Sequence, residues 1–165
     1  MLFQKFGEMG SYEEINSLAE NLKREGDFES LKELAIENGI DAEEAEDFYD
    51  GAKECLIDNA LMAALGKIDV EEKELSINGE DILKDWVDYI RTKCTESELM
   101  QKAVRSKEKS LKGCLGQLIK WGFEHQMSID REIIKAAGVN ASKVTSGTPN
   151  MKTAKLIITR YYCVG

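Results

Sequence analysis

The chain has 165 residues, 42% of them hydrophobic and 32% charged, with a formal net charge of −9. This composition supplies enough apolar residues for a packed core and excludes an intrinsically disordered chain. No apolar run approaches the roughly 18 residues of a membrane span, and the first residues lack the basic and apolar regions of a secretory signal peptide. We therefore expect one domain or two small ones in the cytoplasm, with no membrane partner.

Residues 11–51 carry three consecutive helix patterns. Ser11 begins the first, because Glu14 three residues later completes a capping box. Asp27 and Asp41 are candidate caps of the second and third helices. Each pattern is followed by a glycine, the residue typical of helix ends: Gly26, Gly39 and Gly51.

The spacing of residues 33–48 is typical of a helix-turn-helix unit, whose last helix enters the major groove in many DNA-binding proteins. Here that helix carries a run of carboxylates, which phosphates would repel, so we reject a DNA-reading role. Two interpretations stay open: a solubilising surface, or an array of carboxylates that imitates a phosphate backbone. The acidic candidates for partner binding are Glu43, Glu44, Glu46, Asp47 and Asp50.

The middle of the chain is less polar, and residues 53–67 predict a buried helix. Residues 70–78 alternate weakly and end in Asn-Gly, which leaves a short β hairpin or a loop open. A helix follows from residue 80, and we expect its Trp86 in the core.

Residues 102–123 sort their side chains onto two sides when they are read as a helix, one apolar and one basic. Lys107 falls on the apolar side, which predicts a break between residues 106 and 110 and a second helix from Ser110. A second helix-turn-helix-like unit follows at residues 129–144, where Asn140 caps a short helix, and a last helix starts at Met151. The basic side is either a solvated surface or a surface for phosphates. The basic candidates for binding nucleic acid or a partner are Lys102, Arg105, Lys109, Lys112, Lys120 and Lys143.

Charge divides the chain into two halves of opposite sign. Residues 1–90 hold 25 acidic and 8 basic residues, a net charge of −17, whereas residues 91–165 hold 6 and 14, a net charge of +8. We therefore predict an acidic helical subdomain over residues 1–90 and a basic one over residues 91–165. The predicted fold is an all-α bundle of about seven to nine helices.

The sequence offers no constellation typical of catalysis or metal binding. Its four cysteines are far apart without a C-x-x-C pair, and its single histidine is His125. Phosphate-binding glycine loops, the H-E-x-x-H motif and the G-x-S-x-G elbow are also missing. We predict a protein that is not an enzyme, with no catalytic, cofactor-binding or metal-binding residues and no cofactor.

Three stretches carry a resemblance to a known group of proteins: GSYEEINSLAENLKREGDFESLKELAIENGID, ILKDWVDYI, and the run from KSLKGCLGQLIKWGF to TAKLIITRYY. Together they resemble small acidic proteins of phages and conjugative elements of gut Firmicutes. That group includes anti-CRISPR proteins, which inhibit the type II CRISPR effector nuclease (Cas-nine). The resemblance implies a protein of the bacterial host cytoplasm that binds the nuclease with its guide RNA, without chemistry or a cofactor, and blocks target DNA engagement or cleavage.

An alternative function belongs to another class. The chain would then be a nucleic-acid-binding accessory or regulatory protein of a phage or conjugative element, which binds DNA or RNA through its basic half. Both functions are compatible with a monomer or a homodimer.

Overall fold

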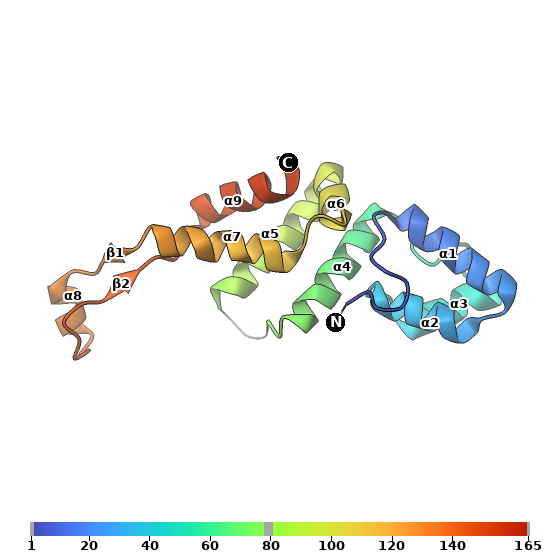
Figure 1. Ribbon diagram of the computed structural model, residues 1–165, viewed down its shortest axis with the longest axis horizontal. Coiled ribbons are helices and arrows are strands. Elements are labelled where there is room, and N and C mark those ends of the chain that lie inside the picture. Colours follow the sequence, from blue (N-terminus) through green and yellow to red (C-terminus); the bar gives the residue numbers. More distant parts are fainter. Residues whose placement is uncertain (1, 78–80, 165) are drawn as a thin grey trace.

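The computed structural model describes residues 2–77 and 81–164, and in these ranges the chain is mostly helical, as predicted. The molecule is elongated: three helices form one end, five form the middle, and a thin arm projects from the other end (Figure 1). The elements in chain order are α1 (Tyr12–Glu25), α2 (Phe28–Glu37), α3 (Ala42–Asp50), α4 (Ala60–Glu74), α5 (Ile82–Glu96), α6 (Glu98–Arg105), α7 (Leu111–Glu124), β1 (Met127–Ser128), α8 (Arg131–Ala136), β2 (Thr145–Ser146) and α9 (Met151–Cys163).

Local capping explains where the first helices begin and end. The Ser11 hydroxyl accepts a hydrogen bond from the backbone N–H of Glu14, and the Asp27 carboxylate accepts one from Ser30 at 3.0 Å. Asp41 occupies the cap position of α3 as predicted, but its side chain makes no capping hydrogen bond. Gly26 ends α1 at φ +75°, a left-handed conformation that favours glycine.

Two hydrophobic cores lie side by side along the molecule, and α4 contributes to both. Ala63 packs in the first core with α1, α2 and α3, whereas Ala64 packs in the second with α5, α6, α7 and α9. Trp86 lies in the second core and is 1% exposed, as the sequence predicted. The two cores therefore divide within α4, and not at residue 90, where the charge of the chain changes sign.

The predicted break in the basic stretch is confirmed. Helix α6 ends at Arg105, and α7 begins after Ser110, whose hydroxyl accepts a hydrogen bond from the N–H of Gly113 at 3.1 Å. Residues 106–110 connect the two helices and let each bury its own apolar side.

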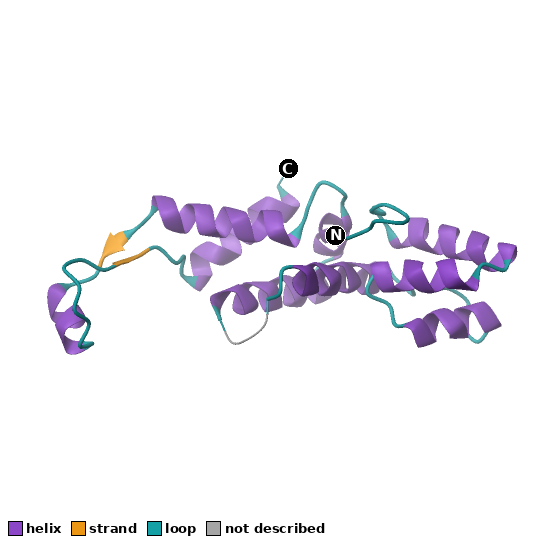
Figure 2. Ribbon diagram, turned by 60° about the horizontal axis from the view of Figure 1, so that its bottom comes forward, coloured by secondary structure: helices purple, strands orange, loops and turns teal. Residues whose placement is uncertain are grey.

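The arm consists of residues 126–150 and contains the antiparallel hairpin and the six-residue helix α8 (Figure 2). The hairpin pairs Met127 with Ser146 and Ser128 with Thr145. It therefore lies far from residues 70–78, where α4 continues to Glu74 and a turn follows; residues 78–80 fall outside the described ranges. The prediction of a short helix after Asn140 is wrong. That segment is extended and leads into β2, and the carbonyl of Val144 accepts a hydrogen bond from the backbone N–H of Ile129.

Two glycines hold the base of the arm against α7. A Cβ atom added to Gly122 would lie 2.3 Å from the carbonyl oxygen of Gly147, and one added to Gly147 would lie 1.9 Å from the carbonyl oxygen of Gly122. Only residues without a side chain allow the two backbones to approach this closely.

Candidate binding surfaces

Four carboxylates of α3 form a single exposed row. Glu43, Glu46, Asp47 and Asp50 lie at positions i, i+3, i+4 and i+7, which places them on one side of the helix. The opposite side is anchored in the first core by Ala45 and Phe48. Within the described part of the chain these four carboxylates make no ion pair, and we call them the α3 acidic row.

Glu44 does not belong to this row. Its carboxylate forms an ion pair with Lys53 at 2.6 Å and is partly covered. Burial lowers the pKa of Lys53, but the hydrogen bond and the charge of Glu44 outweigh burial and raise it. Glu44 therefore contacts the segment after α3 and stands apart from the row, and its role in partner binding stays a prediction.

The six basic candidates are spread over several places. Lys102 lies beside the start of α1, Lys112 lies near Leu2 and Glu74, and Lys143 lies in the arm. Lys109 and Lys120 line the same groove, at different positions along it. Five of the six residues were placed on one side of a helix read over residues 102–123, but of these only Lys109 and Lys120 line the same groove in the described part of the chain.

Arg105 is wrongly predicted as a phosphate-binding residue, because it is only 2% exposed. Its guanidinium donates hydrogen bonds to the carbonyl oxygens of Met9 (2.9 Å) and Ala63 (3.5 Å) and to the side chain of Asn38. Burial lowers the pKa of Arg105 to about 10, which leaves the group charged at neutral pH. Arg105 therefore joins α6 to the first core.

Lys67 is a second buried cation, and it is not among the residues that the sequence predicts for a site. Its ammonium group pairs with Glu8 and donates to the carbonyl oxygens of Ser106 (3.0 Å) and Lys109 (2.7 Å). Its neighbour Glu71, whose pKa is raised by burial, accepts a hydrogen bond from the N–H of Leu111 at 2.7 Å. These contacts hold residues 106–110 in place. A lysine within an apolar helix pattern was the signal available in the sequence.

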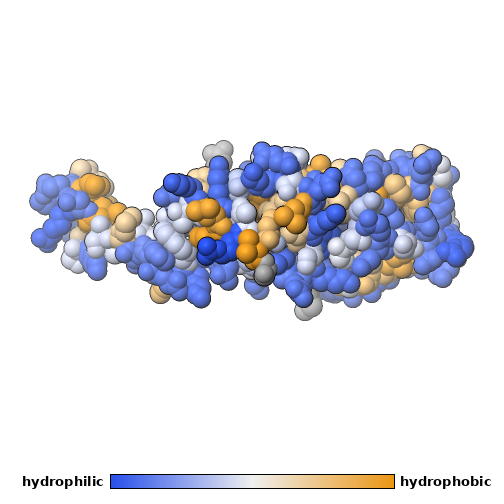
Figure 3. Space-filling model, turned by 90° about the horizontal axis from the view of Figure 1, so that it is seen from above, coloured by the Kyte–Doolittle hydropathy of each residue, from blue (hydrophilic) through white to orange (hydrophobic). Residues whose placement is uncertain are grey.

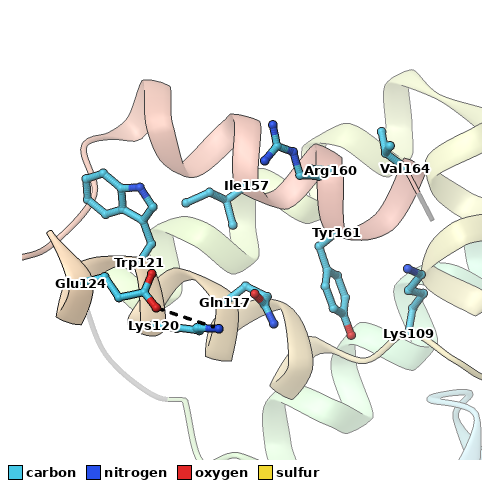
Figure 4. Close-up of a pocket in the computed structure, with 9 residues that line it drawn as sticks. All are labelled: Lys109, Gln117, Lys120, Trp121, Glu124, Ile157, Arg160, Tyr161 and Val164. Carbon is cyan, nitrogen blue, oxygen red and sulfur yellow. Dashed lines mark ion pairs between the residues drawn. The ribbon is translucent and has the colours of Figure 1, made fainter.

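A groove of about 490 Å³ runs between α7 and α9 (Figure 4). Cations and aromatic rings dominate its walls, and Glu124 is the one acidic side chain among the described residues that line it. We call it the α7–α9 groove, and it is lined by Lys109, Gln117, Lys120, Trp121, Glu124, Ile157, Arg160, Tyr161 and Val164.

Several contacts fix the side chains of this groove. The Tyr161 hydroxyl accepts a hydrogen bond from the N–H of Ser110 at 3.1 Å, and the Lys109 ammonium lies 5.1 Å from the centre of the Tyr161 ring. The ring of Trp121 stacks on that of His125, with centres 4.2 Å apart and planes 5° apart. The aromatic rings are therefore held in defined orientations in the absence of a ligand.

Arg160, Trp121 and Tyr161 were missing from the predicted site. Arg160 lies at the surface of α9, but the sequence does not show that α9 packs beside α7. Which helices pack against each other depends on how the whole core is arranged. The local pattern of one helix does not indicate its partner.

The surface seen in Figure 3 is hydrophilic over most of the end formed by α1, α2 and α3, with apolar patches over the middle and on the arm. Within residues 2–77 and 81–164, no three His, Cys, Asp or Glu side chains lie together as a metal site would require, and no helix is long and apolar enough to cross a membrane. The four cysteines are free, and burial raises the pKa of Cys94 and Cys114 to about 12.

Comparison with known proteins adds no relative: no protein-family model, no curated protein and no solved structure matches this chain. The features that bear on function are therefore the α3 acidic row, the α7–α9 groove and the sequence resemblance described above.

Proposed function

We propose that this protein inhibits a type II CRISPR effector nuclease by binding it with the α3 acidic row, on a basic surface that otherwise receives DNA. The resemblance to anti-CRISPR proteins supports the kind of partner, and the exposed row supports the way of binding. Such nucleases hold their nucleic acids in positively charged channels and read a short DNA motif with arginines.

The charge density of the row supports imitation of a phosphate backbone. Four carboxylates over seven residues of helix span about 10 Å, since a helix rises about 1.5 Å per residue. This is about one negative charge per 3.5 Å, close to the 3.4 Å per phosphate along one strand of duplex DNA. A cationic channel would therefore meet a similar linear density of charge.

Repulsion within the row lowers the stability of α3. Glu43 and Asp47 are like charges at i, i+4, as are Glu46 and Asp50, and each such pair destabilises a helix by about 0.2–0.5 kcal/mol. The helix dipole favours Glu43 in the first turn, but no described cation pairs with any of the four carboxylates. A cationic partner would offset the repulsion between them.

The test replaces carboxylates of the row with lysine at positions where a positive charge does not destabilise α3. In the variant Glu46→Lys, Asp47→Lys, Asp50→Lys the new cations lie toward the C-terminal end of α3, where the helix dipole favours them. We expect the concentration needed for half-inhibition of DNA cleavage to rise at least about tenfold, since desolvated charge pairs at interfaces contribute one or more kcal/mol each.

A matched control carries the same change in net charge on other elements. Glu20→Lys, Glu25→Lys, Glu54→Lys reverses three exposed carboxylates of the same end of the molecule that make no ion pair in the described ranges. We expect this control to inhibit nearly as well as the unmodified protein. Equal inhibition by both variants, or no inhibition of the nuclease by the unmodified protein, would refute the proposal.

A further inference from the structure

We propose that the α7–α9 groove binds single-stranded nucleic acid, with phosphates against Lys109, Lys120 and Arg160 and a base stacked on Trp121. The inference does not rest on the proposed inhibition, because it concerns a surface of the free protein and is tested without any nuclease.

The cations of the groove are available to an anionic ligand. Lys109 and Arg160 make no ion pair with any described residue, and the Lys120 side chain is 66% exposed. Lys120 lies 4.0 Å from Glu124, which is the outer limit of an ion pair and holds it only weakly. The three cations and one carboxylate give the groove a net charge of +2.

The aromatic lining provides a stacking platform. Trp121 lines the groove and is held by its parallel stack on His125, so the ring is already oriented before a ligand arrives. Stacking of a base on an aromatic side chain contributes to single-strand binding without regard to sequence, because every base has a π face. Figure 4 shows Trp121 at one end of the groove and Lys109 at the other.

The length of the groove fits a short strand, and its stacking surface favours unpaired bases. Lys109 lies just before α7, and Lys120 lies nine residues after Leu111, about 14 Å along the helix, enough for about four phosphates of a stacked strand. The bases of a duplex are paired and stacked on one another, and therefore cannot stack on Trp121.

The experiment measures binding of fluorescently labelled ten-nucleotide RNA and DNA strands, and of the corresponding duplex, to the full chain at low and at physiological salt. We expect both single strands to bind more tightly than the duplex, with affinity that falls as salt rises. The RNA and DNA arms show which of the two the groove prefers. Tryptophan emission gives a second readout, because Trp86 is buried and a bound base will quench Trp121 alone.

Three variants test the groove itself. Lys109→Ala, Lys120→Ala, Arg160→Ala should lower the slope of log affinity against log salt by about 2, since each lost contact to a single strand removes about 0.7. Trp121→Ala should weaken binding by about tenfold and abolish the emission change. Glu124→Gln should strengthen binding, because it removes the only carboxylate among the described residues that line the groove.

The matched control removes three exposed cations that do not line the groove, Lys73→Ala, Arg131→Ala, Lys152→Ala. It should retain most of the binding and the full emission change, and circular dichroism should show that every variant keeps its helix content. An equal loss in the control and groove variants, a duplex that binds as well as the single strands, or an unchanged Trp121 emission would overturn the proposal.

Discussion

Arg105 and Lys67 use their charges inside the molecule. A buried cation is tolerated only when its donors are satisfied, because moving an unpaired charge out of water costs several kcal/mol. The ammonium group of Lys67 has three partners, and the guanidinium of Arg105 has three as well. Most of these partners are backbone carbonyls of other segments, so both residues fix the fold.

Replacement of Arg105 by alanine should therefore destabilise the protein. The change leaves the carbonyl of Met9 and the side chain of Asn38 buried without their donor, and we expect the free energy of unfolding to fall by about 3 kcal/mol. Lys102 is an exposed cation one turn earlier on α6, and Lys102→Ala should change the free energy of unfolding by less than about 0.5 kcal/mol. Urea denaturation measures both; similar small effects would contradict the role assigned to Arg105.

Two of the three glycines of helix α7, Gly116 and Gly122, have opposite surroundings. At Gly122 an added Cβ would clash with the backbone of Gly147, whereas at Gly116 it would meet nothing within 4 Å. Neither position has a left-handed backbone, so the two sites differ only in their surroundings. Comparing the same substitution at the two glycines therefore measures what the contact between α7 and the arm contributes to stability.

We expect Gly122→Ala to destabilise the protein by about 1–3 kcal/mol, because neither backbone can move aside without disturbing the base of the arm. Gly116→Ala should instead stabilise it by about 0.5–1 kcal/mol, the usual gain from replacing glycine within an exposed helix. Thermal unfolding of the two variants and the unmodified protein provides the comparison. Stabilisation by both substitutions would show that the arm does not hold this close approach.

Local signals in the sequence account for the elements that were predicted well. The capping roles of Ser11 and Asp27 depend only on residues a few positions away. The same is true of the helix break that the position of Lys107 predicts. All three predictions are confirmed. The hairpin of the arm was not found because its strands have two residues each, too few to show alternation. The groove was missed for another reason: it forms where α9 packs beside α7, and that pairing is set by the shared core.

At the scale of the whole molecule, two cores share one helix. Helix α4 contributes Ala63 to the first core and Ala64 to the second, and Gly66 of the same helix lies so close to the backbone of Asn38 that an added Cβ would be 2.1 Å from its carbonyl oxygen. The buried hydrogen bonds of Arg105 cross the same junction. The acidic row and the basic groove are thus carried on one continuous framework at a fixed separation.

This framework predicts that the two cores unfold together. Both tryptophans lie outside the first core, so fluorescence reports on the second core and its surface, whereas circular dichroism at 222 nm reports on all helices. We expect the two urea transitions to coincide.

The stricter test is Phe48→Ala, which removes a ring that is 2% exposed in the first core and should lower the free energy of unfolding by about 3–5 kcal/mol. If the cores are coupled through α4, this change lowers the midpoint of the fluorescence transition as well, although Phe48 belongs to the other core. A fluorescence midpoint that stays in place while the dichroism signal is partly lost at lower urea would show two independent units, and the surfaces they carry would then bind their partners separately.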